Sequence, residues 1–191
     1  MSYSDIDNPS EKASVLIIGM GNVLMQDEGI GVRAAEELES LYHIPQDVEI
    51  MDGGTTGTEL YEPMRGRKHL IIADAVNSSS ASGTLISLKD EQVPAFFQTK
   101  ISNHQLGVSD LLALLQVSGD RPAHVTIIGM VPHSLENRLG LSAKAEAAID
   151  DMVAMLVDEL QNQGIMLKKR DKPLTGYWAN QAMLEEKEEC A

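Results

Sequence analysis

The sequence predicts an α/β fold, a three-layer sandwich in which helices flank a central, mostly parallel sheet of five strands. Short apolar, β-branched runs alternate with helical patterns along the chain, which is the arrangement that βαβ units produce. The runs are apolar at nearly every position, as in strands buried on both faces. One run follows a polar loop in place of a helix, so we expect it to be an antiparallel edge strand.

The five strands are predicted from their apolar runs and from the turns that end them. The second ends in Asp52-Gly-Gly-Thr-Thr-Gly57, a turn rich in residues that tolerate positive φ, and Pro132 stops the fifth. The expected antiparallel strand is the fourth. In chain order, the predicted strand ranges are 14–19, 47–51, 69–73, 83–88 and 125–131.

Apolar residues at spacings of three and four predict the main helices. The first helix follows the first strand, and a short helix is expected over residues 58–64. Gly164 is the expected stop of the last helix. The apolar positions of the three long helices are Ile30, Ala34, Leu38 and Leu41, then Val108, Leu111, Leu112 and Leu115, then Ile149, Met152, Val153, Leu156 and Leu160.

We predict one domain over residues 14–164, between two segments of different composition. Residues 1–13 are expected to be a flexible leader whose polar, acidic character is unlike a signal peptide. Residues 165–191 are predicted to be a polar, acidic tail, solvated around Glu185-Glu-Lys-Glu-Glu189. No apolar run approaches the length of a membrane span, so no membrane partner is expected.

The charge and the cysteine content exclude several classes of function. The formal net charge is -14, which makes nucleic acid and anionic lipid poor partners and favours a metal ion, a cationic peptide or a basic protein surface. The single cysteine, Cys190, allows neither a disulfide framework nor a cysteine-rich metal site within the chain. That cysteine usage fits a reducing compartment, so we expect a cytoplasmic protein.

Ligands of such sheets bind outside the carboxyl ends of the strands, where three polar loops are expected to converge. The first contains Gly19-X-Gly21, which suggests a dinucleotide-binding turn. Leu24, however, occupies the third small position, which would keep the helix from packing closely on the strand. Asp27 and Glu28 would also repel a pyrophosphate. A nucleotide-binding domain therefore remains only a weak alternative.

The acidic residues of these loops suggest a cation site instead. Glu28 and Asp74 are expected to face one crevice, where two carboxylates need a proton, a cation or a basic partner. His104 could add an imidazole, and such a donor set suits nickel, zinc or iron. Structural roles stay open: Glu28 could complement a helix dipole, and His104 could be an ordinary loop residue.

Other polar residues carry predictions of their own. We expect Asp27 to cap the N-terminus of the first helix. Asp52 could either cap its glycine turn through an Asx-type hydrogen bond or face a substrate. The remaining histidines have no acidic motif beside them and are interpreted as structural or exposed: His43, His69, His124 and His133.

An ordered set of short motifs runs along the predicted domain. In chain order they are Gly19-Met-Gly-Asn22, Asp27-Glu-Gly-Ile-Gly31, Asp52-Gly-Gly-Thr55, Ile71-Ile-Ala-Asp-Ala75, Gly83-Thr84 and His104-Gln105. Each motif alone is unspecific, but the ordered set resembles the nickel-iron hydrogenase maturation endopeptidases, and the resemblance runs from about Val15 to Gly164.

The resemblance implies a peptidase, of aspartic or metal-dependent type, that removes the C-terminal extension of the hydrogenase large-subunit precursor after nickel insertion. It implies that Glu28, Asp74 and His104 are both the metal ligands and the catalytic residues. They would contact the nickel of the substrate, for which zinc or cadmium can substitute. The scissile peptide would lie beside Asp52, Gly53, Gly54 and Thr55. A monomer is expected. The alternative is a non-catalytic metal-binding or chaperone module of hydrogenase assembly.

Overall fold

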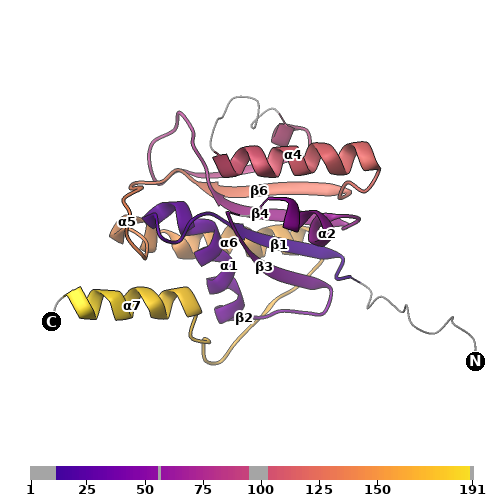
Figure 1. Ribbon diagram of the computed structural model, residues 1–191. Coiled ribbons are helices and arrows are strands. Elements are labelled where there is room, and N and C mark those ends of the chain that lie inside the picture. Colours follow the sequence, from indigo (N-terminus) through magenta and orange to yellow (C-terminus); the bar gives the residue numbers. More distant parts are fainter. Residues whose placement is uncertain (1–11, 56, 95–102, 190–191) are drawn as a thin grey trace, which may run out of the picture.

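The computed structural model describes residues 12–55, 57–94 and 103–189. Its centre is a five-stranded sheet in the order β3-β1-β4-β6-β5 (Figure 1). The pairs β1–β3, β1–β4 and β4–β6 are parallel, and only β5 is antiparallel to its neighbour β6. The strands are β1 (Val15–Met20), β3 (Val48–Gly54), β4 (His69–Ala75), β5 (Leu85–Lys89) and β6 (His124–Met130).

Helices cover both faces of the sheet, which gives the predicted three layers (Figure 1). One face of β1 packs against α1 (Ile30–Leu41) and α6 (Ile149–Asn162). The other face packs against α2 (Tyr61–Met64) and α4 (Asn103–Ser118). Shorter helices are η1 (Gln26–Gly29), η2 (Thr58–Leu60) and α5 (Ala143–Glu146).

The apolar runs form the centre of the sheet because both of their faces are covered. Every residue of β1 and β4 is buried, and each large side chain fully removed from water contributes about 1.5–3 kcal/mol. Leu16 and Ile17, on opposite faces of β1, enter the two separate cores. The predicted fold class is confirmed, including the antiparallel edge strand.

The segment after α6 contains ordered elements that its composition did not predict. Gly164 ends the helix region with φ +79°, as expected. The chain then forms β7 (Lys168–Lys169), which pairs antiparallel with β2 (Tyr42–His43), and α7 (Tyr177–Glu189). Ser40 fixes the connection between them: its Oγ donates to the Leu174 carbonyl oxygen at 2.7 Å. The region predicted as a solvated tail therefore returns to α1.

Helix α1 packs directly on the ends of β1 and β4. An ideal Cβ on Gly31 would lie 2.1 Å from the Ala73 carbonyl oxygen, and one on Gly19 would lie 2.7 Å from the Val32 Cα. The expectation that Leu24 would hold the helix away from the strand is wrong, because Gly19 and Gly31 provide the close approach instead. Helix α1 and the preceding η1 are thereby set at the carboxyl edge of the sheet.

Candidate functional site at the carboxyl edge of the sheet

The polar loops predicted to converge do lie along one edge, because β1, β3 and β4 are parallel. The Gly21 nitrogen, just after β1, donates to the Gly54 carbonyl oxygen at the end of β3, at 2.8 Å. Element η1, which carries Glu28, contacts β4. The glycine turn of the first loop, the Asp52 turn and the end of β4 thus form a continuous rim.

Glu28 and Asp74 reach this rim from different supports. Asp74 is the penultimate residue of β4 and only 4% exposed, so its position is fixed by the centre of the sheet. Glu28 lies in η1 and is half-buried. Gly21, with φ +121°, presses against its backbone: an ideal Cβ there would lie 1.7 Å from the Glu28 carbonyl oxygen. Only glycine fits this close approach, so the absence of a side chain at Gly21 determines where the Glu28 backbone lies relative to the end of β1.

His104 is the second residue of α4, and its side chain lies outside the described part of the structure. Its place beside Glu28 and Asp74 therefore stays a prediction. Among the side chains that are described, no three of the types His, Cys, Asp and Glu form a group able to hold a metal ion. Glu28 and Asp74 lie on segments that contact each other, η1 and β4, and the triad itself stays a prediction.

Asp27 has a different role from the predicted one. Neither η1 nor α1 has a side-chain cap, and the residues at their N-caps are Met25 and Gly29. Asp27 is instead fully buried, and its Oδ2 accepts hydrogen bonds from the His133 nitrogen at 2.9 Å and the Ser134 nitrogen at 3.0 Å. The prediction of a helix cap is wrong because partners distant in sequence use the carboxylate.

Asp52 combines the predicted turn contact with one that was not foreseen. Its Oδ1 accepts from the Gly54 nitrogen at 2.9 Å, which is the Asx-type hydrogen bond expected from the sequence. Its Oδ2 accepts from the Trp178 indole nitrogen of α7, also at 2.9 Å. Asp52 and Thr55 are exposed, whereas Gly53 is buried. The turn therefore presents polar groups to solvent while its centre is fixed to the protein.

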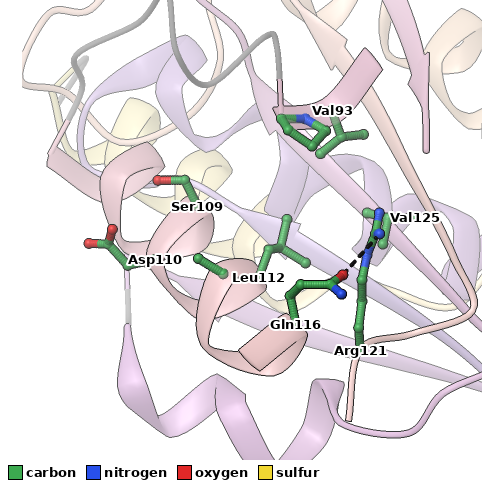
Figure 2. A pocket seen from close by; sticks show the side chains of 9 residues that line it. Val93, Ser109, Asp110, Leu112, Gln116, Arg121 and Val125 are labelled. Carbon is green, nitrogen blue, oxygen red and sulfur yellow. Dashed lines mark hydrogen bonds between the residues drawn. The ribbon is translucent and has the colours of Figure 1, made fainter. Parts of the chain in front are cut away.

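A hollow of about 460 Å³ lies away from this rim, between α4 and the amino end of β6 (Figure 2). Leu112 and Val125 line it, together with Arg121, which donates to Gln116 Oε1 at 3.2 Å. Pro94 also lines this hollow, and the residues that follow it, 95–102, are not described by the structure. The rim is the better candidate because the segments that carry Glu28, Asp52 and Asp74 meet there.

Comparisons with known proteins identify the family of this chain. A family model described as hydrogenase maturation protease matches residues 32–159. The hydrogenase 2 maturation protease of Escherichia coli (strain K12) is 47% identical over 152 residues, which are 79% of this chain and 93% of that protein. The chain belongs to the hydrogenase maturation protease family.

Two further comparisons, one with a solved structure and one with a related sequence, support this assignment. The solved structure of the hydrogenase maturating endopeptidase HybD from Escherichia coli has a TM-score of 0.79 at 46% identity, and it covers 82% of this chain and 97% of that one. The HupD protein of Rhodobacter capsulatus is 40% identical over 157 residues, which are 81% of this chain and 75% of that protein. As a member of this family, the chain is a peptidase with the predicted α/β fold.

The other histidines of this maturation protease lie where the sequence suggested, structural or exposed. His43 and His124 are exposed, and His133 covers Gly83, where an ideal Cβ would lie 2.7 Å from its Nε2. His69 is only 1% exposed, and its Nε2 lies 2.9 Å from Thr126 Oγ1. Burial lowers the pKa of His69 against the opposing attraction of Glu159.

Sequence reasoning missed the contribution of α7 to the rim of this protease. The available signal was the only tryptophan of the chain, Trp178, placed directly after Gly176-Tyr177 in a polar segment. A large aromatic side chain in such a segment favours a docked position. Among the described residues, no helix combines the length and apolar character that crossing a membrane requires.

Proposed function

We propose that this protein removes the C-terminal extension of the nickel-iron hydrogenase large-subunit precursor after nickel has been inserted, and that it recognises the nickel carried by the substrate. The observation that carries the proposal is the shared rim of Glu28 and Asp74 in a chain of the hydrogenase maturation protease family. A cut that requires nickel would couple processing of the precursor to loading of its metal.

The donor chemistry fits a substrate-borne divalent ion. Carboxylates and an imidazole suit first-row divalent ions, and we assign Glu28, Asp74 and His104 as both the metal-contacting and the catalytic residues. Asp74 is held by the buried strand β4, whereas Glu28 is half-buried on η1. A firm inner carboxylate and a more accessible outer one would let an ion enter with its polypeptide. Zinc or cadmium is expected to occupy the same donors.

The scissile segment is proposed to lie along Asp52, Gly53, Gly54 and Thr55. This turn borders the Glu28 loop through the hydrogen bond from the Gly21 nitrogen to the Gly54 oxygen. A bound nickel ion would polarise the scissile carbonyl or acidify a water molecule, and an aspartate at the rim could act as the general base. We propose a monomer that acts in the cytoplasm.

Cleavage of the precursor in its nickel-loaded and nickel-free forms tests the function. The expected result is a shortened large subunit only from the loaded form, with Glu28→Gln and His104→Ala both inactive. Glu39→Gln, at an exposed position of α1, is the matched control and should cleave normally. Equal cleavage of both precursor forms would refute nickel recognition. Metal binding at these residues with no cleavage of any loaded precursor would favour the non-catalytic metal-binding or chaperone module.

A further inference from the structure

The C-terminal helix α7 is anchored by a carboxylate of α1. Glu36 accepts at both oxygens, from the Trp178 nitrogen at 2.7 Å and from the Ala179 nitrogen at 3.1 Å. These are backbone donors of the first turn of α7 that have no partner inside the helix. The Arg33 Nε lies 3.3 Å from Glu36 Oε2, with both side chains largely buried. This ion pair holds the Glu36 carboxylate against the start of α7.

The close approach at the start of α7 depends on Gly176. An ideal Cβ at Gly176 would lie 2.5 Å from Glu36 Cδ, a distance that no side chain tolerates without displacement. Further along the helix, Ala182 lies against Gly140, in the loop after β6. Helix α7 is therefore seated both on α1 and on a loop of the domain, and the orientation of its first turn is set by these contacts.

The first turn of α7 presents the Trp178 indole to the rim. Its Nε1 donates to Asp52 Oδ2 at 2.9 Å, and Asp52 Oδ1 accepts from the Gly54 nitrogen at 2.9 Å. The two donors bind different oxygens, so together they fix the orientation of the carboxylate. Without the indole N–H, the Asp52 side chain would keep only its own turn as a partner among these contacts.

The chain of contacts continues from Asp52 to the candidate metal site. The Gly54 oxygen accepts from the Gly21 nitrogen at 2.8 Å. Gly21 in turn lies against the Glu28 backbone, as shown by the 1.7 Å separation from an ideal Cβ to the Glu28 oxygen. A shift of the Asp52 turn would therefore be transmitted through backbone atoms to the loop that carries Glu28.

We propose that Trp178 is a positioning residue for the Asp52 turn, and that α7 is a third support of the substrate-binding rim. This inference rests on the proposed function for the role of the turn in holding the precursor. The helix lies in the part of this chain that extends past residue 159, where the family model ends. The support that α7 gives to the rim therefore comes from the C-terminal segment of this chain, outside the part that the family model matches.

Trp178→Phe tests the inference, because it keeps one aromatic ring and removes the indole N–H donor together with the second ring of the indole. Amide hydrogen exchange, measured without substrate, should become faster at Gly54 and Gly21 by about fivefold. In processing assays, KM for the nickel-loaded precursor should rise by a similar factor of about five while kcat stays within about twofold. Tyr177→Phe, at a neighbouring position that is 64% exposed, is the control and should change neither quantity.

Glu36→Gln provides an independent route to the same state, since it weakens the anchor of α7 and leaves Trp178 intact. It should accelerate exchange at the same two glycines. Because Trp178 is the only tryptophan, its single indole N–H resonance should shift in Glu36→Gln. Unchanged exchange at Gly54 and Gly21 in Trp178→Phe would overturn the positioning role. So would altered exchange with an unaltered KM. If the unmodified protein cleaves no precursor, the proposed function fails, and the exchange data still decide the role of Trp178.

Discussion

The Asp27 carboxylate and Ser142 are joined by two hydrogen bonds across the molecule. Asp27 Oδ1 accepts from the Ser142 nitrogen at 2.7 Å, and Asp27 Oδ2 accepts from the Ser142 Oγ at 2.9 Å. The same hydroxyl accepts from the Ala145 nitrogen at 3.3 Å and caps α5. The residue beside the candidate ligand Glu28 is therefore a structural clasp between η1 and the loop after β6.

Asp27→Asn should lower the free energy of unfolding by about 1–3 kcal/mol. Both oxygens of the buried carboxylate accept from N–H or O–H donors, so the amide nitrogen of asparagine must face a donor in either orientation. Urea denaturation measures the loss. Asp158→Asn, at an exposed position of α6, should leave the midpoint unchanged. An Asp27→Asn midpoint equal to that of the unmodified protein would contradict the clasp.

Arg67→Lys should also destabilise the fold, by about 1–3 kcal/mol. Arg67 is 4% exposed and donates to the Pro63 oxygen at 2.7 Å, the Ala13 oxygen at 2.6 Å and Glu49 Oε2 at 2.6 Å. A lysine ammonium cannot reach all three from one position. Thermal or urea unfolding checks the change against Arg65→Lys, whose side chain is 42% exposed and whose replacement should have no resolvable effect. Equal stability of the two variants would refute the role of Arg67.

The stability of the fold should fall as the pH is lowered below about 6.5, because of His69. Burial lowers the pKa of this imidazole below the ordinary value of 6.5. Between the two values the unfolded chain binds the proton and the folded protein does not, so protonation favours unfolding. Above a pH of about 6.5 His69 is neutral in both the folded and the unfolded chain, so its stabilising contribution to the fold is fully present. Urea denaturation from pH 5 to 8 measures the slope, and His69→Gln should remove part of it. If the free energy of unfolding of His69→Gln depended on pH as steeply as that of the unmodified protein, His69 would not be the cause.

The apolar pattern predicted the fold because strands buried on both faces, such as β1 and β4, need apolar residues at nearly every position, and such runs are visible in the sequence. The Asx bond of Asp52 was predictable for a similar reason, since its partner Gly54 is two residues away. The partners of Asp27 were not predictable: Ser142 is 115 residues away and meets it only after β6 is placed. Contacts between distant segments depend on geometry that local patterns do not contain.

The docking of α7 illustrates the same limit. Residues 165–191 are polar and acidic, and composition alone indicates solvation. The order of this segment comes from Glu36, whose carboxylate binds the first turn of α7, and from Ser40, which binds the Leu174 oxygen. Both partners are on α1, more than a hundred residues earlier. At the site, the pattern of strands placed Asp74 at the end of β4 and Glu28 in the loop region after β1. Their role as metal ligands with His104 stays a prediction.

Gly21→Ala should damage the site more than the fold. An alanine Cβ would lie 1.7 Å from the Glu28 oxygen at φ +121°, so the Glu28 loop must move away from the rim. We expect metal affinity and precursor cleavage each to fall by about 10–100-fold, as when the support of a metal ligand is lost. Nickel titration and the cleavage assay measure the two effects.

The matched control for Gly21→Ala is Gly66→Ala. Gly66 also has a positive φ, +66°, but an ideal Cβ there meets nothing within 4 Å. Both substitutions impose the backbone strain of a left-handed alanine, about 1–2 kcal/mol; only the one at position 21 displaces Glu28. If Gly66→Ala reduced nickel binding and cleavage as strongly as Gly21→Ala, general destabilisation would explain both losses. If the two variants lost similar stability but only Gly21→Ala lost nickel binding and cleavage, the result would instead locate the chemistry at the Glu28 side of the rim.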